Sequence, residues 1–462
     1  MTMRSGHRVL AVFSAISFTV ASSLAADRVT VTGNVVTTAG QPVAQATVIV
    51  YSAGVKVGYS TYCPTCYPDC GKRTISDANG AFVIAGLSSD LRFRLLVVRE
   101  GYRPTFVPRI DSSAPARAVL ERRPAVEDPA RVVLGRLVDP AGAPLRNAIV
   151  EAQGVAEPGG RQIYGAPDGL EPLAVTNERG EFEIAYGAAA TSMVLLVEAR
   201  GMAPKKLLAV PTGANRQIIV LNEGAVVRGR VLQGGKPVAG AEMGLYSTNH
   251  MNGNGYEEIR VGTKEDGTFA FTNVPTPVDW HLYAKMESIS ARGAIQPVKL
   301  ATRKDLEDVD LGDLKMSAGH RLRGRVVLAD GRPIADGMRV FLTPQCQACG
   351  EEVKYELGSG GSVLRRSFAL MDSQSVLLGP DGRFEFKGLA SGPYQIMASV
   401  KSYGLVSGYS VLRPKGAIDE EKWKGPAEFS SRYLRAANTI EVRVDGDVDD
   451  VIMNLEPRSS PR

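Results

Sequence analysis

Residues 322–333 read Leu-Arg-Gly-Arg-Val-Val-Leu-Ala-Asp-Gly-Arg-Pro, a strand-like segment around Gly324 that runs into a Gly-x-Pro turn. The same pattern occurs three more times, as TGNVV at Gly33, LGRLV at Gly135 and RGRVL at Gly229. The spacings between these glycines are 102, 94 and 95 residues. Self-similarity at a nearly fixed spacing indicates repeated structural units. We therefore expect four copies of one domain of about 95–100 residues, a common domain size.

Each copy continues with the same order of strands and turns. A second apolar strand follows the Gly-x-Pro turn, and a later turn ends in Gly-x-Phe, as in Gly80-Ala81-Phe82 and Gly382-Arg383-Phe384. Glycine adopts positive φ and proline fixes φ, so both motifs favour tight turns. Strands of period two between such turns, without a long helical period, are typical of β-sandwiches. The sequence thus predicts an all-β chain of four tandem antiparallel Greek-key sandwiches.

The repeats set the expected domain boundaries. The sandwiches are predicted at residues 28–125, 131–224, 225–318 and 319–458. The last contains insertions, one of which, at 419–436, has the only helical pattern that we find.

Residues 1–25 have the features of a secretory signal peptide. Arg4 and Arg8 precede the apolar run at 9–24, and Ser23-Leu24-Ala25 fits a small-x-small cleavage site. No second apolar stretch of spanning length follows. We expect a mature chain that is exported, periplasmic or extracellular, without a membrane span.

The composition of the 462 residues narrows the class of protein. Hydrophobic residues make up 44% and charged residues 22%, which suits a folded chain and argues against disorder. A formal net charge of +5 is too small for the electrostatic footprint of a nucleic-acid-binding protein. We expect no nucleic-acid partner.

The Gly-centred strand, the Gly-x-Pro turn, the second strand and the D-x-x-G-x-F turn together resemble the carboxypeptidase regulatory-like domain. The resemblance covers nearly all of the chain after the signal peptide. Copies one and four match the pattern best, whereas copy two has Asn177 in place of Asp and copy three lacks a Gly-aromatic pair after its long strand. The resemblance implies a transthyretin-like (prealbumin-type) β-sandwich, which in this family is usually an accessory module. The shared motifs are turn and core residues, so no peptidase activity is implied.

The chain lacks the residue patterns of an enzyme site. A zinc carboxypeptidase needs a His-x-x-Glu pair and a distant His, and none of His250, His281 and His320 has Glu at that spacing. Neither a Gly-x-Ser-x-Gly elbow nor a phosphate-binding loop occurs. We expect no enzymatic activity and no cofactor. Acidic clusters at 305–310 and 445–450 offer oxygen ligands for Ca²⁺ without EF-hand spacing, and solvated turns are the alternative.

Cysteine usage is the unusual feature of the sequence. All five cysteines fall in the loop between the second strand and the Gly-x-Phe turn of copies one and four: Cys63, Cys66 and Cys70, and Cys346 and Cys349. In an exported chain the first interpretation is local disulfides with one thiol left over. Cys-x-x-Cys spacing also suits structural zinc. A redox dithiol like that of thioredoxin-type proteins is the third interpretation.

Tyrosines lie around the first cysteine cluster. Tyr59, Tyr62 and Tyr67, with Tyr102, form a candidate aromatic patch for a sugar or peptide, with core packing as the alternative. Variable loops on a fixed scaffold commonly carry binding specificity. We expect a non-enzymatic exported protein with a binding or structural role at the cell envelope, and a protein or carbohydrate ligand. The alternatives are a thiol- or metal-binding envelope protein and an accessory subunit of a separately encoded peptidase.

A thiol and metal count on the mature protein separates these interpretations. If the cysteines form local disulfides, denatured protein from an oxidising compartment exposes one thiol, reduction exposes five, and no metal is bound. About one equivalent of zinc or copper, or a dithiol that cycles at a mild potential, contradicts the disulfide interpretation and favours the thiol or metal protein.

Overall fold

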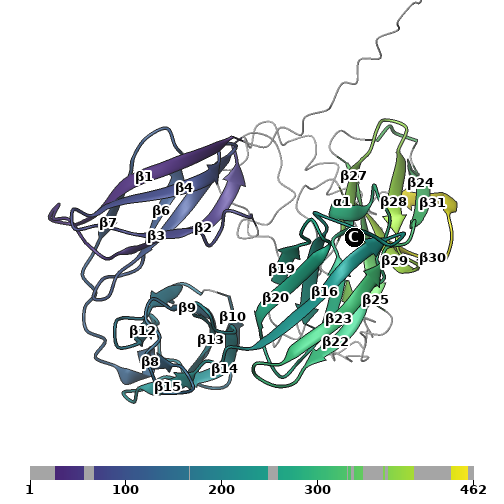
Figure 1. Cartoon of the computed structure of the whole chain (residues 1–462). Helices are drawn as coiled ribbons and strands as arrows, with labels where there is room; N and C mark the ends of the chain where they lie inside the picture. Colours follow the sequence, from purple (N-terminus) through teal and green to yellow (C-terminus); the bar gives the residue numbers. More distant parts are fainter. Residues whose placement is uncertain are drawn as a thin grey trace, which may run out of the picture.

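The computed structural model describes residues 27–56, 67–165, 167–247, 259–329, 331–334, 338–346, 368–369, 373–399 and 439–455. These residues form four β-sandwiches in chain order (Figure 1), which confirms the predicted fold class. The predicted signal peptide and the helical segment at 419–436 lie outside the described residues. None of the helices in the described ranges is long and apolar enough to cross a membrane.

The first sandwich packs a three-stranded sheet, in the order β4-β1-β7, against a four-stranded sheet, in the order β3-β2-β5-β6. Its strands are β1 (Arg28–Thr37), β2 (Thr47–Val55), β3 (Arg73–Ile75), β4 (Ala81–Ser88), β5 (Leu91–Val98), β6 (Thr105–Ile110) and β7 (Ala116–Leu120).

The second sandwich repeats this plan after a short 3₁₀ turn, η1 (Pro129–Arg131). One sheet has the order β12-β8-β15, and the other has the order β10-β9-β13-β14 with β11 also paired to β9. The strands are β8 (Val132–Val138), β9 (Ile149–Ala156), β10 (Gln162–Tyr164), β11 (Leu173–Val175), β12 (Glu181–Ala185), β13 (Ser192–Glu198), β14 (Lys205–Pro211) and β15 (Gln217–Val220).

The third sandwich has the sheets β17-β16-β20, with β23 also paired to β16, and β19-β18-β21-β22. Its elements are β16 (Ala225–Gln233), β17 (Lys236–Pro237), β18 (Glu242–Ser247), β19 (Ile259–Gly262), β20 (Thr268–Val274), β21 (Val278–Ala284), α1 (Met286–Ile289), β22 (Val298–Thr302) and β23 (Asp308–Lys315).

The fourth sandwich has the sheets β28-β24-β31 and β26-β25-β29-β30, with β27 also paired to β25. Its strands are β24 (His320–Leu328), β25 (Arg339–Cys346), β26 (Phe368–Ala369), β27 (Gln374–Leu377), β28 (Arg383–Leu389), β29 (Gly392–Ser399), β30 (Thr439–Val444) and β31 (Val448–Leu455).

The two repeated sequence motifs meet in the three-stranded sheet of every copy. The glycine of the first strand lies directly opposite the phenylalanine of the Gly-x-Phe motif, and the four pairs are Gly33–Phe82, Gly135–Phe182, Gly229–Phe269 and Gly324–Phe384. A Cβ at any of these glycines would lie less than 3.0 Å from the ring. The phenylalanines are at most 4% exposed. Each ring therefore fills the space over the glycine and seals one end of the core.

The Gly-x-Phe turn is also hydrogen-bonded to the first strand. The N–H of Val35 donates to the carbonyl of Gly80 at 2.8 Å, and Val326 donates to Gly382 at 2.8 Å. Both glycines have φ above +70°. A side chain at Gly80 would also strike the carbonyl of Val35, so only glycine fits this turn.

One feature of the topology goes beyond the prediction. In each copy the last strand pairs in parallel with the first, in the pairs β1·β7, β8·β15, β16·β23 and β24·β31, while the other ladders are antiparallel. The sequence pattern predicts antiparallel sandwiches and does not reveal this parallel pair, because strand patterns do not encode strand direction. It also did not predict the one-turn helix α1.

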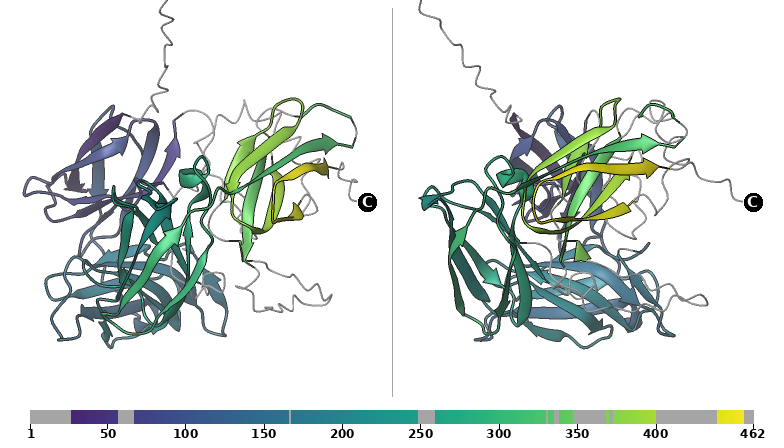
Figure 2. Two further views of the ribbon diagram at one scale, coloured as in Figure 1. Left: turned by 45° about the vertical axis from the view of Figure 1, so that its right-hand side comes forward. Right: turned by 90° about the vertical axis from the view of Figure 1, so that its right-hand side faces the viewer.

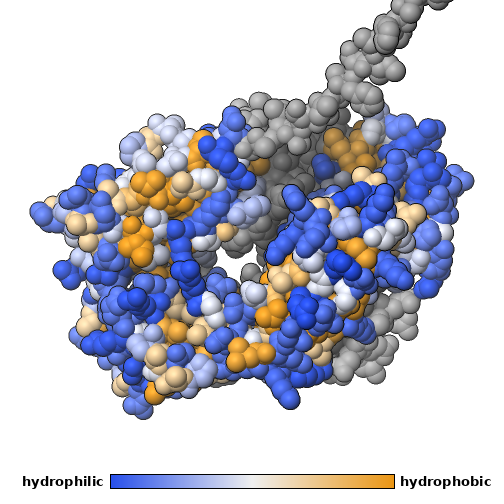
Figure 3. Space-filling view, viewed as in Figure 1, coloured by the Kyte–Doolittle hydropathy of each residue, from blue (hydrophilic) through white to orange (hydrophobic). Residues whose placement is uncertain are grey.

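The connections after the second and third sandwiches are short, and the array bends. Four residues separate β15 from β16, and four separate β23 from β24. Sandwiches one and four lie on the same side of sandwich two in Figures 1 and 2. The space-filling view shows an opening between sandwiches one and two on the left and sandwiches three and four on the right (Figure 3).

Specific contacts hold the joints beyond the first pair. At the second joint Asn273 Nδ2 donates to the carbonyls of Gly201 at 2.9 Å and Glu223 at 2.7 Å, and Gly224 N–H donates to Asp305 Oδ1 at 2.6 Å. At the third joint Met286 of α1 belongs to the core cluster of sandwich four. Each joint thus restricts the orientation of its neighbours.

The Gly–Phe contact gives a stability test. Phe82→Ala or Phe384→Ala removes a ring that is at least 96% buried and should cost about 3–5 kcal/mol in its own sandwich. Hydrogen exchange followed by mass spectrometry locates the loss. Val83→Ala, on the same strand but 55% exposed, is the matched control and should change stability by less than about 0.5 kcal/mol. Equal effects of Phe82→Ala and Val83→Ala would contradict the assigned facing of β4.

Candidate functional site

The first two sandwiches share a hydrophobic contact outside their own cores. Ile49, Leu96 and Val98 of sandwich one form a buried cluster with Ile149 and Leu173 of sandwich two. Half-buried Tyr51, Phe106 and Val175 pack against this cluster. The outward faces of the β2–β5 sheet and of the β9 sheet are therefore pressed together, which fixes the angle between the two sandwiches.

An arginine from the connecting segment adds an ionic contact to this joint. Arg123 Nη1 lies 2.8 Å from Glu171 Oε2, and Arg123 Nη2 also pairs with Glu183 on β12. Glu171 accepts a further bond from the N–H of Ala185 at 2.8 Å. Burial raises the pKa of Glu171 in spite of the adjacent Arg123, and the nearby Glu183 raises it further.

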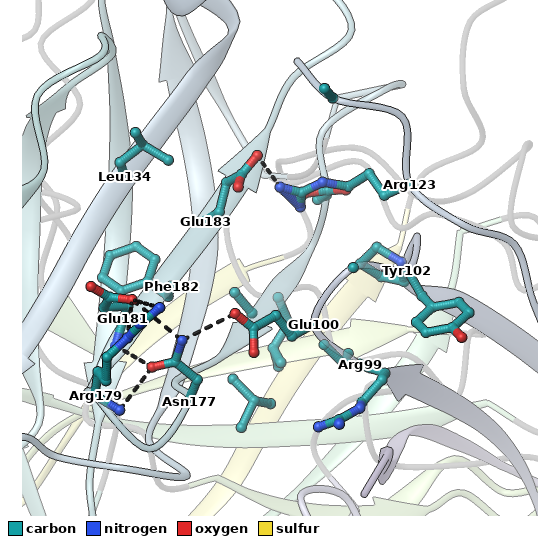
Figure 4. A pocket seen from close by; sticks show the side chains of 18 of the residues that line it. Arg99, Glu100, Tyr102, Arg123, Leu134, Asn177, Arg179, Glu181, Phe182 and Glu183 are labelled. Atoms are coloured by element: carbon teal, nitrogen blue, oxygen red, sulfur yellow. Dashed lines mark hydrogen bonds and ion pairs between the residues drawn. The ribbon is translucent and has the colours of Figure 1, made fainter. Parts of the chain in front are cut away.

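Next to this ion pair lies a cleft of about 290 Å³ between the two sandwiches (Figure 4). Its lining includes the apolar side chains of Val98, Leu134 and Phe182. Its walls carry equal numbers of arginines and glutamates, with Asn177 and Tyr102, and the charged residues are Arg99, Arg123, Arg179, Arg216, Glu100, Glu171, Glu181 and Glu183. The cleft thus brings apolar side chains and convergent polar groups together, and both are features of ligand sites.

A hydrogen-bond network orders the polar wall. Asn177 Nδ2 donates to Glu100 Oε1 at 3.0 Å, across the two sandwiches. Arg179 Nη2 and Arg216 Nη1 lie 2.8 and 3.2 Å from the carboxylate of Glu181. Burial alone raises the pKa of Glu181, but the bonds from Asn177 and Arg179 and the charge of Arg216 outweigh it, so the pKa is lowered. Glu181 stays ionised and orients the guanidinium groups around it.

Tyr102 is the predicted site residue that lines the cleft. Its ring is half-buried, and Arg122 Cζ lies 5.0 Å from the ring centroid. Figure 4 shows Arg99, Glu100 and Tyr102 on the sandwich-one side, with Asn177 and Arg179 across the cleft. Tyr67 instead belongs to the core of sandwich one, so core packing accounts for it.

The cysteine loop falls largely outside the described residues. Tyr59, Tyr62, Cys63, Cys66 and Cys349 are not described, and of Cys346 only the backbone is. Cys70 is half-buried against the core of sandwich one. Burial raises the pKa of the Cys70 thiol to about 11, and the charge of Asp69 also raises it, so the nucleophilic thiolate is disfavoured there.

A buried carboxylate anchors the end of this loop. Asp69 is 1% exposed, and its Oδ1 accepts from Lys72 Nζ at 2.6 Å and from Arg28 Nη1 at 3.2 Å. Its Oδ2 accepts from the N–H of Ser88 at 2.8 Å. Through these bonds Asp69, which directly precedes Cys70, is held to Arg28 of β1 and Ser88 of β4.

Several carboxylates of the two acidic clusters considered for Ca²⁺ are bound by neighbouring groups of the fold. Asp308 and Asp310 pair with Arg228, and Asp305 accepts the N–H of Gly224. Asp447 pairs with Arg321. Within the described ranges no three His, Cys, Asp or Glu side chains lie close enough together to hold a metal ion.

Most residues of the cleft were not predicted as site residues. They lie in turns and on strand faces of different copies, and only the packing of copy one on copy two brings them together. The available signal was the continuous apolar run Leu95-Leu96-Val97-Val98 at the end of β5. A strand without polar alternation is covered on both faces, so something must pack on its outer side.

Comparisons with known proteins add little about function. No family model matches the sequence, and no curated protein was found to be similar to it. Similar solved structures include the Bacillus anthracis TIE protein, at 10% identity and a TM-score of 0.18, covering 94% of this chain and 75% of that one. A streptococcal ancillary pilin has 11% identity and a TM-score of 0.22, covering 72% and 99%. The minor pilin GBS52 of Streptococcus agalactiae has 12% identity and a TM-score of 0.23, covering 52% and 98%. Similarity at this level says nothing about what the chain binds.

The Asp69 contacts predict a dependence of stability on pH. Burial raises the pKa of Asp69, but the bonds from Lys72 and Ser88 and the charges of Lys72 and Arg28 outweigh it, so the pKa falls below its ordinary 3.8. The stabilisation is complete above pH 3.8 and is lost as the pH falls through the lower folded-state pKa.

Asp69→Asn should therefore cost sandwich one about 1.5–3 kcal/mol at pH 7, the range for hydrogen bonds to charged groups. The difference from the wild type should narrow in acid. Hydrogen exchange at pH 7 and urea unfolding at low pH measure the two limits. Asp90→Asn, which changes an exposed carboxylate in the same sandwich, serves as the control. An equal loss from both substitutions would show that Asp69 is not the anchor.

Proposed function

We propose that this chain is an exported, non-enzymatic array of carboxypeptidase regulatory-like sandwiches that binds a protein or carbohydrate ligand at the cell envelope. The ligand site is the cleft between the first two sandwiches. The observation that carries the proposal is a cleft with a hydrogen-bonded polar wall at a joint fixed by the Ile49–Leu173 cluster and the Arg123 ion pairs. A preformed site loses little conformational entropy on binding.

The residues of the cleft favour binding over catalysis. Serine, threonine, cysteine, histidine and lysine are absent from its lining in the described chain, so the nucleophiles that its walls offer are carboxylates and the Tyr102 phenol. Of the carboxylates, Glu171 and Glu183 share Arg123, and Glu181 holds Arg179 and Arg216. A pair of catalytic carboxylates needs open space between them for a substrate or water. Here a guanidinium group lies between Glu171 and Glu183.

The remaining sandwiches suit a structural role. Short connections and specific joint contacts, through Asn273 and Met286, restrict the relative motion of the sandwiches. A stiff array holds its binding end at a defined distance from whatever anchors the other end. An apolar leader at residues 1–25 supports export to the periplasm or the outside of the cell.

Two alternatives depend on other features of the sequence. A thiol- or metal-binding envelope protein would use Cys63, Cys66 and Cys70 or Cys346 and Cys349, and the raised pKa of Cys70 disfavours a reactive thiolate at that position. If the chain is an accessory subunit of a separately encoded peptidase, a hydrolase should co-purify with it.

A substitution that fills the cleft tests the proposal. Ala125 is exposed and lines the cleft, so Ala125→Trp should block it with little effect on either core. Full-length mature protein is screened against a glycan array and against purified envelope proteins. We expect a bound ligand whose affinity falls at least about tenfold, or 1.4 kcal/mol, in Ala125→Trp.

The matched control is Ala141→Trp, at an exposed turn of sandwich two that does not line the cleft. It should bind like the wild type. Retention of the ligand by Ala125→Trp would place binding elsewhere. Failure of the wild type to bind any member of either ligand class would leave the array with a structural role alone.

A further inference from the structure

Three arginines that make no ion pair with a described carboxylate lie at the sandwich-one edge of the cleft, its mouth: Arg99 lines the cleft, and Arg103 and Arg122 are chain neighbours of lining residues. Arg123, Arg179 and Arg216 are used in ion pairs with glutamates. In the described part of the chain, Arg99 has one hydrogen bond, to the carbonyl of Gln45 at 3.3 Å. Arg122 lies over Tyr102, and neither it nor Arg103 takes part in an ion pair between described residues.

The backbone holds these arginines and Tyr102 on two paired segments. Residues 99–102 form a turn in which Tyr102 N–H donates to the carbonyl of Arg99 at 3.0 Å. Gly101 takes the positive φ, +79°, that the turn requires. The turn is bridged to the connecting segment, since Arg103 N–H donates to Glu121 O at 2.9 Å and Arg123 N–H donates to Gly101 O at 3.0 Å. The guanidinium groups therefore extend from a fixed platform.

The whole first sandwich also carries an excess of positive charge. Residues 27–123 contain twelve Lys and Arg against seven Asp and Glu, a net charge of +5. Of the carboxylates on the two paired segments, Glu100 is turned across the cleft to Asn177, and Glu121 is exposed (Figure 4). Guanidinium groups left unpaired in such a setting attract planar anions and bind carboxylates with two parallel hydrogen bonds.

We infer that the mouth of the cleft binds an anionic carbohydrate, a polysaccharide rich in uronic acids. This inference rests on the proposed function and names the ligand class of that site. The half-exposed ring of Tyr102 packs against the apolar face of a pyranose, while Arg99, Arg103 and Arg122 pair with carboxylates along the chain. A cleft of about 290 Å³ suits one or two sugar rings better than a folded partner.

The test uses full-length mature protein and an oligogalacturonate of defined length, titrated by calorimetry at low and high salt. Arg99→Gln/Arg103→Gln/Arg122→Gln should weaken binding at least about tenfold and flatten its salt dependence. The matched control Arg73→Gln/Arg92→Gln/Arg117→Gln removes the same charge from exposed positions of the same sandwich that lie on β3, β5 and β7, outside the two paired segments around Tyr102. It should keep the affinity within about twofold.

Tyr102→Ala separates recognition of sugar from recognition of charge. It should weaken binding of oligogalacturonate and leave the weaker binding of poly-glutamate unchanged. Equal affinity for poly-glutamate, with no effect of Tyr102→Ala, would overturn the inference in favour of an acidic peptide. Absence of oligogalacturonate binding also overturns it. The proposed function survives that result if a protein or neutral glycan is lost in Ala125→Trp, so the two failures are distinguishable.

Discussion

The structure depends on one contact made four times, a phenylalanine ring laid over a glycine on the neighbouring strand. The glycine weakens its own strand, because it has no side chain to pack. The ring from the Gly-x-Phe turn supplies the missing apolar surface and occupies space that any Cβ would block. Because the pair joins the first strand to a distant turn, it also sets the register between them, as in Gly33–Phe82. The remaining strands of each copy pack around this fixed corner.

The fold was readable from sequence because its determinants are local. Turn glycines need positive φ, prolines fix φ, and alternating strands have one buried face, so each signal lies within a few residues. A buried hydroxyl before the Gly-x-Phe turn is another such signal that sequence reasoning overlooked. Ser76, Thr176 and Thr263 each accept and donate one bond to the segment after the Gly-x-Pro turn. The fourth copy has Leu378 there, and its N–H donates to the carbonyl of Met338 at 2.9 Å.

The cleft was not predictable because it belongs to no single copy. Tyr102 belongs to the predicted aromatic patch, but Asn177 and Glu181, which line the cleft with it, come from a turn about 75 residues later. The cysteine loops have an unusual composition, whereas the cleft is lined largely by arginines and glutamates, which are common on any protein surface. Its distinction is the joint itself, where the outward faces of two sandwiches exclude water and an arginine is shared by two carboxylates. The cleft thus exists because two sandwiches of the same fold carry different residues on their outward faces and pack against each other there.

The parallel pairing of first and last strands has a mechanical consequence. In every sandwich the chain enters along one strand and leaves along its hydrogen-bonded neighbour in the same direction, as in β1 and β7. The entry and exit points therefore lie at opposite ends of that ladder. Tension along the chain slides the two strands past each other and loads all their hydrogen bonds together, instead of opening them one after another. A tether built of such units resists extension under flow or during contact with a surface.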